Sequence, residues 1–155
     1  AIRDADGRPL STGFTDRPLR LEMEFDLLAE PSGLCIGFDL VHQDGTVVLR
    51  SNHNDRSEFD WPSLHVGRNR LSCIIPPGLL TFGTYHFLPR IGLHGVRWLV
   101  NDPRGVSIDM RLNHSDSPYW TAELRDKFPG VIAPCFRWEQ LNEAPASTQT
   151  VKNAS

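Results

Sequence analysis

The chain has 155 residues, 39% of them hydrophobic, and a formal net charge of −3 from 16 Lys and Arg against 19 Asp and Glu. This size suits a single domain that folds without disulfides, and three widely spaced cysteines (Cys35, Cys73 and Cys135) form neither a disulfide framework nor a zinc-binding pattern, which fits a reducing compartment. The absence of a basic stripe argues against a nucleic-acid partner, and the short apolar runs exclude a transmembrane helix in this sequence.

The first predicted element is a strand at Leu19–Leu27. Apolar and charged side chains alternate there with a strict period of two, which indicates a strand with one buried and one solvated face. Residues 1–16 are polar, and we expect them to be a linker. The chain begins with Ala rather than Met, which indicates a piece of a longer protein.

A β-hairpin that ends in a run of polar residues follows in residues 34–56. Apolar positions in 34–40 and 47–49 flank an Asp44-Gly45 turn, and this arrangement is typical of a tight hairpin. Residues 50–56 then bring hydrogen-bonding side chains together without an apolar residue among them. Such a run either solvates a loop or binds a polar ligand.

The later segments repeat the strand pattern. Alternation recurs in residues 71–75, 85–91 and 106–112, separated by Gly and Pro turns about every ten residues. We expect a last strand in 129–138, interrupted by Pro134, one short helical turn at most in 119–128, and a flexible tail in 142–155. The pattern predicts an all-β fold, an antiparallel β-sandwich of immunoglobulin-like or jelly-roll type with seven to nine strands over residues 17–141.

One sequence pattern suggests a metal-binding site. His53 and Asp55 have the H-x-D spacing of two-His, one-carboxylate iron sites, with His86 or His94 as the further ligand. The pattern is short, so a metal-dependent jelly-roll enzyme is an alternative and not the main interpretation. The sequence contains no other enzyme motif, and we expect neither catalysis nor a cofactor.

The aromatic residues favour sugar binding, because flat rings cover the apolar faces of sugars and planar polar groups pair with their hydroxyls. Trp61 and Trp120 lie in polar, loop-like surroundings and are the ligand candidates among the tryptophans. Trp98 and Trp138 lie beside apolar neighbours, and we expect them in the core. The predicted glycan contacts are Arg50, Asn52, His53, Asp55, Arg56, Trp61, Tyr85, Arg90 and His94.

The order of these segments resembles the C-terminal domain of Wzt-type ATP-binding subunits, from the ABC transporters that export O-antigen polysaccharide across the bacterial inner membrane. The matching segments lie within residues 17–140: the strand Leu19–Leu27, the hairpin GFDLVHQDGTVVLRSNHND, the segment IIPPGLLTFGTYHFLPRIGLHG, the strand GVSIDM and the end segment PGVIAPCFRW. Ser51 and Asn52 match a Ser or Thr followed by Asn that is typical of the family after the hairpin.

The resemblance implies a noncatalytic β-sandwich that binds the finished glycan, often at its modified non-reducing end. It also implies a homodimer at the cytoplasmic face of the membrane, together with the nucleotide-binding domain and the membrane subunit. A purely dimerising interaction domain is the remaining alternative.

Overall fold

The computed structural model describes residues 1–102, 104–113 and 130–140, which form nine strands and one short 3-10 turn. The strands are β1 (Ile2–Arg3), β2 (Thr12–Phe14), β3 (Leu19–Leu27), β4 (Leu34–His42), β5 (Val47–Asn52), β6 (Gly67–Ile75), β7 (Gly83–Leu93), β8 (Arg97–Asn101) and β9 (Val106–Arg111), with the turn η1 (Glu58–Asp60) between β5 and β6. None of the described helical segments is long or apolar enough to cross a membrane.

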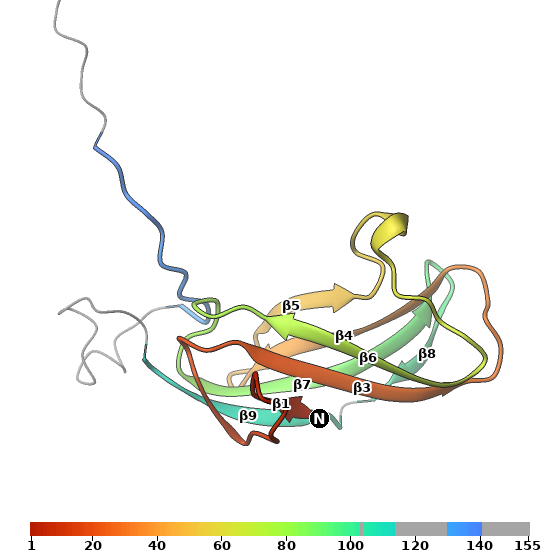
Figure 1. The fold of residues 1–155 in the computed structure, drawn as a ribbon, viewed down its shortest axis with the longest axis horizontal. Helices are drawn as coiled ribbons and strands as arrows, with labels where there is room; N and C mark the ends of the chain where they lie inside the picture. Colours follow the sequence, from red (N-terminus) through yellow and green to blue (C-terminus); the bar gives the residue numbers. More distant parts are fainter. Residues whose placement is uncertain (103, 114–129, 141–155) are drawn as a thin grey trace, which may run out of the picture.

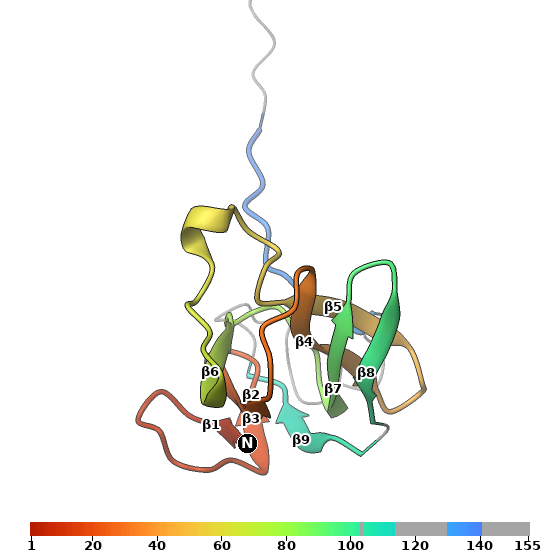
Figure 2. The same cartoon turned by 90° about the vertical axis from the view of Figure 1, so that its right-hand side faces the viewer.

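The strands form two sheets that face each other (Figures 1 and 2). Strands β1, β3 and β6 form the three-stranded sheet, and the six-stranded sheet has the order β2-β9-β7-β4-β5, with β8 beside β7. All pairs are antiparallel except β2 with β9. The predicted all-β sandwich is therefore confirmed.

The alternating pattern of β3 produces the expected one-sided burial. Leu19, Leu21 and Leu27 are buried, and β3 pairs with β6 along its whole length, from Leu19 opposite Ile75 to Leu27 opposite Gly67. Inward-facing residues of the other sheet close the core from the opposite side, among them Phe38, Leu40, Phe87 and Ile108. Removing such side chains from water is the main stabilising contribution, about 1.5 to 3 kcal/mol for each.

Residues 1–16 differ from the expected linker, because they contribute β1 to one sheet and β2 to the other. Ile2 is buried against the core, and a side chain on Gly13 would collide with the Met110 sulfur, 2.8 Å from the added Cβ. Strands of two and three residues are too short to show a period in a polar sequence, which is why the pattern did not reveal them.

The strand predicted for 129–138 is wrong for the described residues 130–140. They contain one isolated bridge, between Ile132 and Leu80, followed by the Ala133 N–H donating to the Leu79 carbonyl over 3.0 Å. Pro134 comes next and has no N–H with which to continue a ladder. The predicted helical turn in 119–128, Trp120 and the predicted tail in 142–155 lie outside the described residues.

Candidate functional site

The candidate site lies on the outer face of the six-stranded sheet. Ile36, Phe38 and Leu40 of β4 point into the core, so the residues between them, Gly37 and Asp39, point outward. Asp39 is nevertheless only 4% exposed. A carboxylate buried on an outward face requires partners that cover it and satisfy its oxygens.

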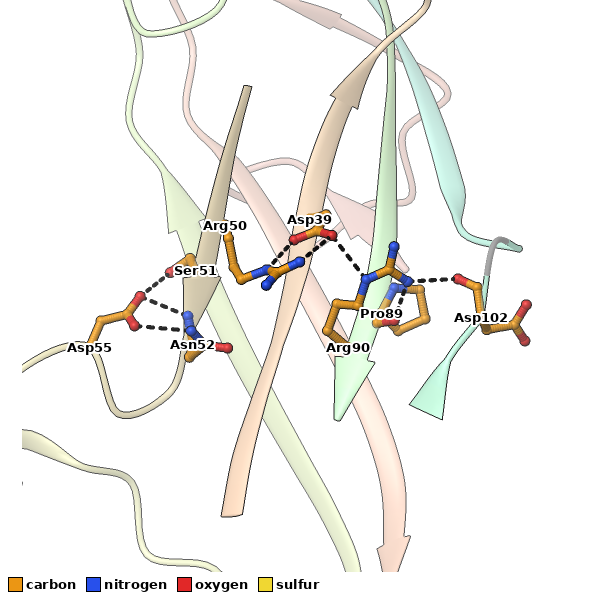
Figure 3. Close-up of polar contacts among 8 residues, drawn as sticks. All are labelled: Asp39, Arg50, Ser51, Asn52, Asp55, Pro89, Arg90 and Asp102. Atoms are coloured by element: carbon orange, nitrogen blue, oxygen red, sulfur yellow. Dashed lines mark hydrogen bonds and ion pairs between the residues drawn. The ribbon is translucent and has the colours of Figure 1, made fainter. Parts of the chain in front are cut away.

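Two arginines supply those partners (Figure 3). Arg50, directly opposite Asp39 on β5, donates from Nε to Oδ1 over 2.6 Å and from Nη2 to Oδ2 over 2.9 Å. Arg90 of β7 reaches Asp39 from the other side, with Nε 2.9 Å from Oδ2, and its Nη1 donates to the Asp102 carbonyl over 3.3 Å. One carboxylate therefore ties three neighbouring strands together.

These contacts fix the charges of the cluster. The hydrogen bonds from Arg50 hold the pKa of Asp39 below its ordinary value of 3.8, against the opposing effect of burial. The same contact raises the pKa of Arg50. The ion pair is therefore fully charged at neutral pH and holds the Arg50 side chain in one orientation.

Trp98 of β8 lies beside this cluster and completes a groove. The guanidinium carbon of Arg50 lies over the Trp98 ring, 5.0 Å from its centroid, and the Trp98 side chain is 47% exposed. A hollow of about 520 Å³ opens here, between the β7–β8 hairpin and the end of β5. Its lining comprises Cys35, Arg50, Asn52, Gly92, Leu93, His94, Gly95, Val96, Arg97 and Trp98.

The absence of a side chain at Gly92 leaves room for the Trp98 ring. A Cβ at this position would lie 2.9 Å from Cε3 of Trp98 and 3.0 Å from the Arg97 carbonyl oxygen. We therefore predict that Gly92→Ala moves the Trp98 ring away from Arg50 and costs about 1 to 3 kcal/mol of stability through overpacking. The Trp98 indole N–H signal in a ¹H–¹⁵N spectrum should shift. Cys35→Ala, which changes the groove residue opposite Gly92 on β4, should leave this signal in place. An unchanged indole signal in Gly92→Ala would contradict this role.

The sequence-predicted residues divide between this groove and a second hollow. Arg50 and His94 line the groove, and Asn52 lines both. The second hollow, about 650 Å³, opens between the two sheets below the loop that follows β5, and its lining includes His53, Asp55 and Arg56. The predicted polar cluster is therefore continuous in sequence but faces two different spaces.

The loop after β5 uses most of its polar atoms to hold its own shape. Asp55 accepts hydrogen bonds from the Asn52 backbone N–H over 2.7 Å and from the Ser51 hydroxyl over 3.2 Å (Figure 3). His53 Nδ1 accepts a hydrogen bond from the Ile36 N–H over 3.1 Å, and burial lowers the pKa of the His53 imidazole. These contacts stabilise the loop and leave fewer groups for a ligand.

Trp61, Arg56 and Tyr85 lie apart from the groove. Trp61 donates from Nε1 to the Arg56 carbonyl over 2.8 Å, and the Arg56 side chain pairs with Asp60 over 3.3 Å. Tyr85 corrects the predicted contact set, because it is fully buried and its hydroxyl donates to the Val131 carbonyl over 2.7 Å. Its burial raises the pKa of the hydroxyl to about 12, so Tyr85 is a neutral core residue and not a surface contact.

Arg90 is brought to the site but lies below its surface. Its side chain is 13% exposed and is paired with Asp39, so it holds that carboxylate in place and is not itself an open contact for a ligand. His94 lies in the exposed turn between β7 and β8, fixed by its backbone N–H donating to the Gly33 carbonyl over 2.8 Å. Its imidazole is therefore carried at the rim of the groove.

The structure does not gather the ligands of the alternative metal site. His86 lies opposite Val41 in the β4–β7 ladder, whereas His53 accepts a hydrogen bond from the Ile36 N–H. Ile36 and Val41 are five residues apart on β4, a separation of about 17 Å in an extended strand. His86 instead bonds the Ser107 hydroxyl over 2.8 Å. Within residues 1–102, 104–113 and 130–140, no group of three or more His, Cys, Asp or Glu is placed to hold a metal ion.

Sequence reasoning missed Asp39 and Trp98. Trp98 was expected in the core, but β8 carries it on the outer face opposite Gly92, and Trp138, also expected in the core, is 92% exposed. A signal was present for Asp39, because a charged residue between Phe38 and Leu40 faces outward next to a cross-strand arginine. The pairing itself could be read only with the strand register in hand.

No protein-family model and no curated protein sequence matches this chain. Among solved structures, the fold is similar to the crystal structure of the C-terminal domain of Wzt, with a TM-score of 0.57 and 17% sequence identity. The match covers 90% of this chain and 80% of the Wzt domain chain. It confirms, at the level of the fold, the resemblance that the sequence predicts.

Proposed function

We propose that this chain is a noncatalytic carbohydrate-binding module that recognises O-antigen polysaccharide, at its non-reducing end, for export by an ABC transporter. The observation that carries the proposal is the groove in which the partly exposed Trp98 ring lies beside the anchored Arg50 guanidinium and the Asn52 amide. The segment order that resembles Wzt-type subunits supports the same function, and the similar fold of the Wzt domain is consistent with it.

The groove has the chemistry that sugars require. Vicinal hydroxyls pair with planar groups such as guanidinium and amide, and an aromatic ring covers the apolar face of a sugar. Arg50 is held by the two hydrogen bonds that it donates to Asp39, so little side-chain freedom is lost on binding. Each new hydrogen bond replaces one to water and contributes about 0.5 to 1.5 kcal/mol, so affinity should be modest, as suits a cargo that must be released.

The partners follow from the same proposal. The module acts in a homodimer, attached to the nucleotide-binding domain of the transporter and close to its membrane subunit, at the cytoplasmic face of the inner membrane. Hydrolysis of ATP belongs to the nucleotide-binding domain, and the groove has only a binding role.

The direct test is titration of the ¹⁵N-labelled chain with a panel of purified bacterial O-polysaccharides. We expect at least one of them to shift the signals of Asn52, His94 and Trp98 at millimolar concentration of repeating unit, and to do so less when its non-reducing terminal residue is removed. If no polysaccharide shifts these signals, the proposal fails and a purely dimerising domain becomes the better interpretation. Signals of β1, on the other sheet and outside both hollows, serve as the internal control.

A further inference from the structure

His53 closes the end of the β4–β5 ladder with its side chain. The last paired residues are Gly37 and Asn52, and in the next position the His53 N–H donates to the Ile36 carbonyl over 2.8 Å. In return the Ile36 N–H donates to Nδ1 of the imidazole over 3.1 Å, where a regular antiparallel ladder would use the His53 carbonyl. Ile36 is buried, so its N–H needs a partner inside the protein, and the imidazole is that partner.

The imidazole accepts this hydrogen bond only in its neutral form. A nitrogen that accepts carries no proton, so neutral His53 has its proton on Nε2, whereas a protonated imidazole has an N–H at both nitrogens. Protonation would place a second N–H against that of Ile36, and the ring would have to leave its position. Burial lowers the pKa of the His53 imidazole, in agreement with a neutral side chain in the folded protein.

The charged and titratable residues around the imidazole come from its own loop and from β6. Asp55 and Arg56 of the loop and Arg70 and Cys73 of β6 line the same hollow as His53. The negative charge of Asp55 favours the protonated imidazole, but burial has the larger effect on the pKa of His53. Burial also raises the pKa of the Cys73 thiol, which is therefore neutral at neutral pH. Among these types of side chain, histidine is the one whose ordinary pKa falls between pH 5 and pH 8.

The turn that His53 begins also holds Asn52 in the groove. Asn52 lies opposite the outward-pointing Gly37, so its side chain lies on the outer face of the sheet, as does that of Arg50 two residues earlier. The Asp55 carboxylate accepts hydrogen bonds from the Asn52 backbone N–H over 2.7 Å and from the Asn52 Nδ2 over 3.2 Å (Figure 3). His53 lies between Asn52 and Asp55 in the chain, so a displacement of His53 moves this carboxylate away from Asn52.

We infer that His53 is a positioning residue of the glycan site, whose neutral imidazole fixes the turn after β5 and thereby holds the Asn52 amide in the groove, and whose protonation releases both. The inference rests on the proposed function and adds a pH dependence to it. Because the pKa of His53 is lowered from its ordinary value of 6.5, glycan affinity should be full at neutral pH. It should fall as the pH passes below 6.5 and through the lower value of the folded chain.

The first test needs no ligand and follows the ¹⁵N-labelled chain by NMR as the pH is lowered from neutral. At neutral pH the His53 imidazole should carry its proton on Nε2. The amide signals of Ile36 and Asn52 should then shift with the same midpoint as the imidazole, whereas those of β1, on the other sheet, should not follow it. A proton on Nδ1 at neutral pH, or Asn52 signals that do not follow the imidazole, overturns the inference and leaves the proposed function intact.

The second test measures affinity for the tightest-binding O-polysaccharide of the panel at neutral pH and about one pH unit below the measured imidazole midpoint. Affinity of the natural chain should fall roughly two- to tenfold, as expected for the loss of one hydrogen bond to the ligand. His53→Asn keeps an acceptor oxygen at the same distance in bonds from the backbone but does not titrate, so it should bind well at neutral pH and lose the pH dependence. His53→Ala removes the acceptor and should bind weakly at both pH values.

Two other histidines make this comparison specific. His94, at the rim of the groove, is present in both the natural chain and His53→Asn, so its own titration cancels between them. His65→Asn is the matched control, because His65 is exposed and lines neither hollow, and it should leave the pH dependence unchanged. An equal fall in affinity in His53→Asn overturns the inference. Absence of binding at every pH contradicts the proposed function, and the Asn52 signals alone then decide whether His53 holds this residue.

Discussion

Replacing Asp39 with asparagine should lower the free energy of unfolding by about 3 kcal/mol, because it leaves the mostly buried Arg90 charge without its counterion. The amide keeps the shape of the carboxylate, so the loss reports charge and hydrogen bonding and not a cavity. Arg50 is half exposed and can be rehydrated, so we expect the cost to lie at the lower end of that for broken buried pairs. Urea denaturation followed by fluorescence measures the change.

Asp109→Asn is the matched control for that substitution. Asp109 lies on the same outer face, is exposed, and accepts a hydrogen bond from the Thr84 hydroxyl over 2.6 Å; among the described residues no arginine pairs with it. Its replacement should cost less than about 1 kcal/mol. Equal losses in the two variants would show that the Asp39 cluster makes no special contribution.

The Asp39 cluster also predicts a pH dependence. Because Arg50 lowers the pKa of Asp39 in the folded chain, this carboxylate contributes stability above its unfolded pKa of about 3.9. That stability is lost as the pH falls through the lower folded value. The difference in unfolding free energy between the natural chain and Asp39→Asn should therefore be constant from pH 7 to pH 5 and shrink below about pH 4. Other carboxylates such as Glu22, whose pKa Arg70 and Arg3 lower to about 2, are present in both proteins and cancel in this difference.

Replacing Trp98 with alanine should produce the largest loss of glycan affinity, about 2 kcal/mol or roughly 30-fold. The ring is the aromatic surface that lines the groove among the described residues, and it also holds the Arg50 guanidinium in place. Stability should change by much less than affinity, since the ring is 47% exposed and its contact with Arg50 contributes about 0.5 to 1 kcal/mol. Titration with the tightest-binding polysaccharide measures the effect.

Trp138→Ala provides the comparison, because Trp138 is 92% exposed and does not line the groove. Its replacement should leave binding unchanged, and Trp98→Phe should restore part of what Trp98→Ala loses. Full affinity in Trp98→Ala would remove the groove from the proposed function and direct attention to the second hollow, near His53 and Arg56.

The long strands could be predicted because their signal is local. Period-two alternation in β3 follows from the geometry of a strand with one buried face, and its bounds agree with the prediction. The hairpin of β4 and β5 is equally local, with Gly45 adopting the positive φ of 89° that its turn requires. The short strands β1 and β2 carry no such pattern, and their residues were expected to form a linker. Residues 129–138 were predicted as a strand, but the described residues 130–140 contain only one isolated bridge before Pro134.

Only part of the candidate site could be predicted from the sequence. Arg50, Asn52 and His94 were identified because polar residues gathered at the end of a hairpin or in a turn suggest a ligand. Trp98 was assigned to the core because its sequence neighbours are apolar, but the face on which a strand residue lies depends on its register with β7, which shifts by a bulge near Gly92. Tyr85 was predicted as a glycan contact, although its alternation with Phe87 placed it on the face of β7 that is buried.

The amino-acid order by itself determined an all-β chain, its long strands, its tight turn and the polar segment after β5, because each depends on residues within a few positions of one another. Only the tertiary structure decided that Asp39, Arg50 and Arg90 share one charge cluster and that Trp98 lies above Gly92 at a groove. Those contacts join residues up to 51 positions apart. The register of the strands decides which residues meet, and a buried carboxylate is stable only when it is paired.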